Sequence, residues 1–161
     1  MSEIKFPIYL DHHATTPLDK RVFDQMIPYF LEKFGNASSL DHTFGYEASV
    51  AVESAREKIA NGINARHDEI IFTSGATESN NIALIGTMQK YADRGNHLIT
   101  CVTEHKAVLD TARHLESLGN KITYLSVNKY GEIDLDELKN SITEKTVMIS
   151  IMAANNEIGI F

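Results

Sequence analysis

The sequence has 161 residues, enough for one domain with a sizeable core, and its 43% hydrophobic and 23% charged residues are ordinary for a globular protein. A net charge of -7 provides no basic field for a phosphate backbone, which argues against nucleic acid as a partner. No apolar run approaches the roughly 20 residues of a membrane span, the N-terminus lacks the pattern of a signal peptide, and the single Cys101 fits a reducing compartment, so we expect a cytoplasmic protein without a membrane partner.

The first part of the chain predicts two helices. Residues 18 to 34 carry apolar side chains at four-residue spacing (Val22, Met26 and Phe30), and Pro28 should kink or split this helix. Residues 34 to 45, FGNASSLDHTFG, are rich in glycine, asparagine and serine and predict a loop. A second helix is expected over residues 45 to 61, with an inner face of Ala48, Val52, Ala55 and Ile59.

The rest of the chain alternates strands with helices. We expect four strands, which are EIIFTS, HLITCV, KITYLSV and TVMISIMAA. The helices between them are residues 76 to 92, with an inner face of Ala83, Leu84, Thr87, Met88 and Tyr91, then residues 105 to 119, ended by Gly119, and a short helix that begins at Asp134. This alternation predicts an α/β fold with a mostly parallel sheet and helices on both faces, in which ligands bind at the carboxyl ends of the strands.

The segment LDHHATTP, residues 10 to 17, raises the question of a metal site. Asp11, His12 and His13 are good ligands for manganese, zinc or iron, and a DHH triplet after a strand is typical of a class of metal-dependent phosphoesterases. Adjacent histidines in a strand, however, point to opposite faces and cannot both ligate one ion. The later strand ends also lack the further aspartates of a dinuclear site, so we expect no metal here.

The segment TSGATESNN, after the first expected strand, is a candidate anion site. Gly75 permits a tight turn, and the backbone amides of Gly75, Ala76 and Thr77 would open the next helix, where free amides attract anions. The alternative is that Ser74 or Gly75 merely caps the helix, with Glu78 at its third position, and caps are the commoner case. The segment matches neither the P-loop nor the dinucleotide fingerprint.

Further candidates follow the second and fourth strands. His105, at a strand-to-helix turn, could stack on a planar ligand or move a proton, although an isolated histidine there more often caps a helix. Asn155 and Asn156 offer amides that donate and accept, although an asparagine at a strand end often only closes a turn. Cys101 is better explained as a small buried thiol than as a nucleophile.

The order and spacing of these segments are more informative than any one of them. IYLDHHATTP, FGNASS, EIIFTSGATESNN, TEHKAVLDTARHLE, ITYLSVNKYGEIDLDEL and ISIMAANNEIG together resemble the cysteine desulfurases of the IscS/NifS type, class V aminotransferases that use pyridoxal 5'-phosphate (PLP). The resemblance covers residues 7 to 160, and TSGATES and TEHKAVL are its most specific parts. It implies an N-terminal active-site segment (residues 1–17) and an incomplete PLP-binding large domain of fold type I (residues 18–161).

The resemblance also implies an activity and a set of site residues. Family members convert L-cysteine to L-alanine and keep the sulfur as a persulfide on a catalytic cysteine, for transfer to an iron–sulfur scaffold protein or a tRNA-thiolation protein. The complete enzyme is expected to be a homodimer. By position, Ala76 and Thr77 match the residues that hold the PLP phosphate, and Gly75 provides the tight turn directly before them. His105 matches the histidine that stacks on the pyridine ring and assists proton transfer, and Asn156 matches the asparagine that hydrogen-bonds the phenolic oxygen.

The resemblance places several of the family's active-site groups beyond Phe161. These are the Schiff-base lysine, the aspartate that pairs the pyridine nitrogen and the nucleophilic cysteine. We therefore expect the chain to stop within the fold and to be inactive alone, and we expect its uncovered surfaces to make it unstable or to cause self-association. The alternatives are a non-catalytic fragment, one half of a split enzyme, or a class V enzyme similar to selenocysteine lyase.

Overall fold

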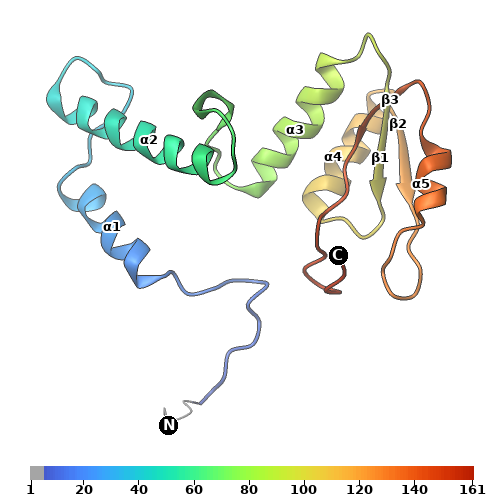
Figure 1. The fold of residues 1–161 in the computed structure, drawn as a ribbon, viewed down its shortest axis with the longest axis horizontal. Helices are drawn as coiled ribbons and strands as arrows, with labels where there is room; N and C mark the ends of the chain where they lie inside the picture. Colours follow the sequence, from blue (N-terminus) through green and yellow to red (C-terminus); the bar gives the residue numbers. More distant parts are fainter. Residues whose placement is uncertain (1–5) are drawn as a thin grey trace. The chain divides into compact units, whose positions relative to one another are not determined.

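The computed structural model describes residues 6–161, which form two compact units divided between Phe72 and Thr73 (Figure 1). Within this described part, no helix is both long enough and apolar enough to cross a membrane.

The first unit is helical. Asp19 caps its first helix by accepting a hydrogen bond from the backbone N–H of Arg21 at 2.8 Å, and His42 caps the second by accepting from Gly45 N–H through Nδ1 at 3.1 Å. Pro28 does not split the first helix, which continues beyond it for another three residues. The elements of this unit are α1 (Lys20–Leu31), α2 (Thr43–Gly62) and the short 3-10 helix η1 (His67–Glu69).

The apolar stripes expected to be buried in the first unit are largely exposed. On α1, which has no buried residue, Phe30 is 70% exposed, and Val22 and Met26 are exposed as well. Of the expected inner face of α2 only Ala48 is buried. An amphipathic stripe becomes buried only where another element packs on it, and among the described residues no other element packs closely on α1. The self-association expected from such surfaces stays a prediction.

The second unit is an α/β fold with a parallel three-stranded sheet in the order β2-β1-β3. The central strand pairs with both neighbours, with His97 opposite Lys121 on one side and Leu98 opposite Met148 on the other. Asp134 caps the last helix by accepting from the backbone N–H groups of Asp136 and Glu137. The elements in chain order are α3 (Ala76–Lys90), β1 (His97–Cys101), α4 (Lys106–Ser117), β2 (Lys121–Leu125), α5 (Leu135–Ser141) and β3 (Thr146–Ile149).

Helices cover both faces of this sheet, as expected. The chain moves outward from β1 to β2 through α4 and then back across β1 to β3 through α5. Parallel crossovers are right-handed as a rule, so opposite directions of travel place α4 and α5 on opposite faces, as Figure 1 shows. The core lies on the α4 face and consists of Leu84 and Met88 of α3, Leu98 of β1, and Val108, Ala112 and Leu115 of α4.

Two of the expected strands are corrected by the structure. EIIFTS is not a strand: Glu69 ends η1, Ser74 lies in a bend, and Ile71 between them is 69% exposed. An apolar extended segment becomes a strand only when another strand pairs with it, and within residues 6–161 none does. The fourth expected strand, TVMISIMAA, ends at Ile149, although the N–H of Ser150 still donates to Ile99 O at 2.9 Å.

Candidate functional site

A pocket of about 330 Å³ lies at the carboxyl ends of β1 and β3. Residues 102–106, which follow β1, form one wall, and residues 155–158, which follow β3, form the other. The pocket therefore brings together His105 and Asn156, two residues that lie about fifty positions apart in the chain. This is the edge of the sheet at which ligands bind in parallel α/β folds, so the pocket is the candidate site.

His105 is the N-cap residue of α4. Its backbone is extended, and its Nδ1 accepts a hydrogen bond from the N–H of Ala107 at 3.0 Å. The capping alternative is thus confirmed, and it has a chemical consequence. Because Nδ1 is the acceptor, the neutral ring carries its proton on Nε2, the nitrogen that the cap leaves free.

The two adjacent asparagines have different surroundings. Asn155 is buried, and its side chain bonds to the backbone of Thr103, Glu157 and Ile158. Asn156 is exposed, and its side chain has no hydrogen-bond partner within residues 6–161. Of the two, Asn156 is therefore the one whose amide can serve a ligand in the pocket.

The first turn of α3 presents the expected free amides. Gly75 is its N-cap and has an extended backbone, and a side chain at that position would meet no atom within 4 Å. In the described residues, no acceptor is found for the N–H groups of Ala76, Thr77 and Glu78. The arrangement is an open helix N-terminus that suits an anion.

The Glu78 side chain bonds to Ser74, just before α3, and not to the free N–H groups of the first turn of the helix. Its carboxylate accepts from the backbone N–H of Ser74 at 2.6 Å and from the Ser74 hydroxyl at 2.7 Å. These two hydrogen bonds lower the pKa of Glu78 below its ordinary value. The side chain is thus engaged with Ser74, and the amides of the first turn remain free.

A side-chain relay connects α3 with α4. The Asn81 amide donates to Thr77 O at 2.8 Å, and its Oδ1 lies 2.8 Å from the hydroxyl of Thr111 on α4. Thr111 is buried, so this bond is shielded from water. The relay fixes the start of α3 relative to α4, the helix that begins at His105.

Comparison with known proteins identifies the family. The profile of the aminotransferase class-V family matches residues 8–161. The chain belongs to this family.

Within the class-V aminotransferases, the chain is similar to cysteine desulfurases. It is 58% identical to cysteine desulfurase IscS of Rickettsia felis over 154 residues (96% of this chain and 38% of the relative), and 58% identical to IscS of Neisseria meningitidis over 157 residues (98% and 39%). Among solved structures, a NifS-like protein has a TM-score of 0.90 at 43% identity (94% of this chain and 42% of that one). SspA in complex with cysteine has a TM-score of 0.85 at 40% identity (92% and 43%).

The chain thus spans less than half the length of these relatives. Members of this class-V family are PLP-dependent. The residues present suit such a group. An anionic phosphate binds to free helix amides, a planar ring stacks on an exposed imidazole, and a ring oxygen accepts from an amide donor. This chain offers these at Ala76 and Thr77, at His105 and at Asn156.

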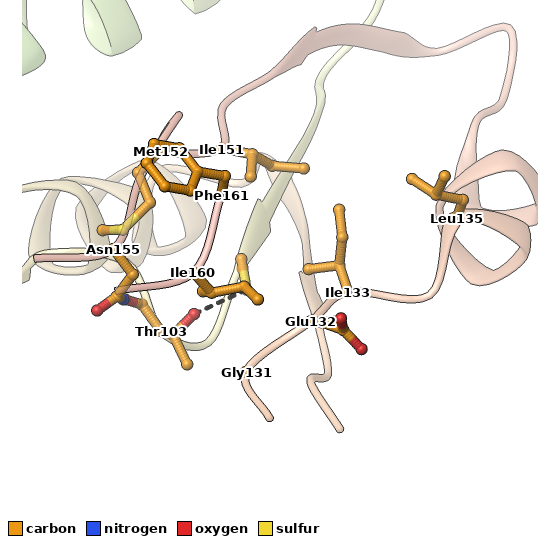
Figure 2. A pocket seen from close by; sticks show the side chains of 11 residues that line it. Thr103, Gly131, Glu132, Ile133, Leu135, Ile151, Met152, Asn155, Ile160 and Phe161 are labelled. Carbon is orange, nitrogen blue, oxygen red and sulfur yellow. Dashed lines mark hydrogen bonds between the residues drawn. The ribbon is translucent and has the colours of Figure 1, made fainter. Parts of the chain in front are cut away.

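Cys101 of this class-V aminotransferase is buried, as expected. Its Sγ lies 3.2 Å from the hydroxyl oxygen of Thr103, and it lines a second pocket of about 370 Å³ on the α5 side of the sheet (Figure 2). Apolar side chains from the segments before α5 and after β3 surround this pocket, among them Ile133, Ile151 and Ile160. No basic side chain lines it, so nothing there activates the thiol.

The segment LDHHATTP is irregular, and His12 and His13 lie in a turn, so the opposite-face argument, which holds only in a strand, does not apply. The two histidines nevertheless have separate partners. His13 Nδ1 lies 2.9 Å from Asp11 Oδ1, and the His12 ring packs edge-on against Tyr9 at 5.2 Å. No group of three or more metal-ligating side chains is found among residues 6–161.

Sequence reasoning missed the roles of Glu104 and of the Asn81–Thr111 relay. Glu104 is buried, and its Oε1 accepts from the backbone N–H of Met152. The position of Glu104 between β1 and His105 was a usable signal. A charged residue next to a buried strand must be either exposed or paired, so a bonding partner could have been suspected. The relay had no local signal, because its two residues lie on different helices.

Proposed function

We propose that this chain is the N-terminal part of a PLP-dependent cysteine desulfurase, which converts L-cysteine to L-alanine and keeps the sulfur as a persulfide. The observation that carries the proposal is the convergence of His105 and Asn156 on one pocket at the carboxyl ends of β1 and β3. The similarity to IscS proteins over nearly the whole chain supports it. SspA, whose structure contains cysteine, supports the choice of substrate.

Each candidate residue has a role that its surroundings favour. The N–H groups of Ala76 and Thr77, at the open start of α3 formed by Gly75, would hold the phosphate, and the Thr77 hydroxyl would add a hydrogen bond. The Asn156 amide would donate to the phenolic oxygen, and the His105 ring would lie against the pyridine ring. When bound, PLP supplies an electron sink for negative charge that develops next to the substrate's amino group.

His105 would also handle a proton. While Nδ1 accepts from the Ala107 N–H, the neutral ring carries its proton on Nε2 and can donate it in a hydrogen bond, and it can take up a second proton only at Nδ1 after that nitrogen releases the Ala107 N–H. Protonation at Nδ1 would break the cap of α4, and the cap therefore favours one tautomer.

The proposal extends to the setting of the whole protein. We expect a cytoplasmic homodimer in which residues 1–17 approach the active site of a PLP-binding large domain that begins at residue 18. The sulfur would pass to an iron–sulfur scaffold protein or to a tRNA-thiolation protein. The covalent lysine and the sulfur-carrying cysteine would come from outside residues 1–161.

The test is to purify the full-length gene product with PLP and to measure alanine released from L-cysteine. We expect alanine and protein-bound persulfide in the wild type, and at least about a hundredfold loss of rate in His105→Ala, the lower end of the usual range for a residue that moves a proton. The control is His114→Ala, on the exposed side of α4, which should keep the wild-type rate. Alanine without persulfide, with selenocysteine preferred over cysteine, would favour a selenocysteine lyase. No reaction with either substrate would favour a non-catalytic fragment or half of a split enzyme.

A further inference from the structure

Two buried polar side chains lie directly beside the residues proposed to contact the cofactor. Asn155, next to Asn156, is 7% exposed, and Glu104, next to His105, is 8% exposed. Each belongs to one wall of the pocket at the strand ends: Asn155 bonds to the backbone of the opposite wall, and Glu104 bonds to the backbone of Met152, in the segment that leads from β3 to the opposite wall. Their contacts explain how two separate segments keep a common geometry.

Asn155 uses both ends of its amide. Its Nδ2 donates to the carbonyl of Thr103 at 3.0 Å, across to the segment after β1. Its Oδ1 accepts from the N–H groups of Glu157 and Ile158, both at 2.9 Å, within its own turn. Figure 2 shows Asn155 and Thr103 lying side by side at one end of the second pocket.

Glu104 makes the reciprocal connection. Its Oε1 accepts a hydrogen bond from the backbone N–H of Met152, in the segment after β3. A charge-assisted bond of this kind is stronger than a neutral one, and burial protects it from competition by water. The segments that follow β1 and β3 are therefore joined by bonds in both directions.

We propose that Asn155, together with Glu104, is a positioning residue that holds Asn156 and His105 in one fixed arrangement. Asn156 makes no side-chain bond of its own among the described residues, and His105 is held only by its cap, so the place of each is set by its bonded neighbour. This proposal rests on the proposed cofactor role of Asn156 and His105.

The competing explanation is that Asn155 only closes the turn after β3. Asn155→Asp separates the two. The aspartate keeps an acceptor for the N–H groups of Glu157 and Ile158, but it replaces the donor to Thr103 O with an oxygen that repels that carbonyl. The substitution therefore removes the bond between the walls and preserves the turn.

Hydrogen exchange of the full-length gene product measures this directly. In Asn155→Asp we expect faster exchange in residues 103–107 and wild-type protection of Glu157 and Ile158. The matched control is Asn120→Asp, which removes a comparable 2.9 Å bond from a side-chain amide to Leu115 O at the amino-terminal side of β2. It should leave residues 103–107 unchanged. Wild-type exchange in residues 103–107 of Asn155→Asp would overturn the proposal.

A second readout uses the absorbance of bound PLP against pH. A hydrogen bond from Asn156 to the deprotonated phenolic oxygen lowers the pH at which that oxygen titrates, so Asn156→Ala should shift the titration to higher pH. Asn155→Asp should shift it in the same direction, weaken PLP binding about two- to tenfold, and add little in the double variant. An unshifted titration with only less PLP bound would indicate a general structural defect and contradict positioning.

The two readouts separate the proposals from each other. Failure of the wild type to bind PLP would refute the proposed function, while the exchange experiment would still decide whether Asn155 joins the two walls.

Discussion

His97 shows at the scale of one residue how the sheet uses a polar side chain for structure. It is 1% exposed at the start of β1, and its two ring nitrogens lie 2.8 Å from the hydroxyls of Thr146 on β3 and Thr123 on β2. Burial, and secondarily the positive charge of Lys121, lower the pKa of His97. The imidazole therefore bridges all three strands in its neutral form.

This lowered pKa predicts a loss of stability in mild acid. In the unfolded chain His97 has a pKa of about 6.5, which is above its pKa in the folded protein. Between those two values the unfolded state therefore binds more protons than the folded state. The contribution of neutral His97 to the free energy of unfolding should therefore be complete above the unfolded-state pKa. The free energy of unfolding should fall as the pH drops from 7 toward 5. Denaturant melts across this range should show a shallower pH dependence in His97→Gln.

The exposed His114 of α4 provides the control, and His114→Gln should retain the wild-type slope. A His97→Gln protein with an unchanged slope would mean that His97 does not cause the pH dependence.

At this scale the sequence predicted which residues would face a ligand but not which residues hold them in place. His105 and Asn156 were predicted from their places after strands and from the family resemblance, and the structure brings them to one pocket. Asn155 and Glu104 bond across some fifty residues of chain, so no local pattern could pair them. His97 was missed because its partners come from two different strands.

The relay between α3 and α4 is the feature of most consequence at the scale of elements. Thr111→Val keeps the shape of the side chain but removes the hydroxyl, which lies 2.8 Å from both Asn81 Oδ1 and Ala107 O, and so leaves Asn81 Oδ1 without its donor. We expect the free energy of unfolding to fall by about 1 kcal/mol, the usual cost of one such bond. In an Asn81→Ala background the same substitution should cost less, because the bond is already absent. Equal costs in both backgrounds, measured by denaturant melts, would contradict the relay.

Elements were predictable where the chain itself supplies their partners. α3, α4 and β1 occur close to their expected bounds because they pack on one another around Leu84, Leu98 and Ala112. EIIFTS has an equally apolar pattern and is not a strand, since strand formation depends on a pairing partner that no local pattern reveals. Gly119, with φ +93°, lies just after α4, as its expected role at the helix end requires.

At the scale of the whole molecule the two units differ in how much of their apolar surface they cover. The second unit has a closed core between its sheet and α4, whereas the first unit leaves large side chains such as Phe30, Phe34 and Phe44 exposed. The fold class was predictable from the alternation of elements, because βαβ crossovers impose a parallel sheet. The exposure of apolar side chains in the first unit was not predictable, because periodicity shows that a helix has an apolar face but not what covers that face.

The central claim is that the open start of α3 is the phosphate site of a PLP-dependent enzyme. The most direct measurement compares the affinity of the full-length gene product for PLP with its affinity for pyridoxal, which lacks the phosphate. We predict a strong preference for PLP that Thr77→Val reduces about two- to tenfold by removing one hydrogen bond, with pyridoxal binding unchanged. Equal affinity for the two compounds, or a preference untouched in Thr77→Val, would contradict the account.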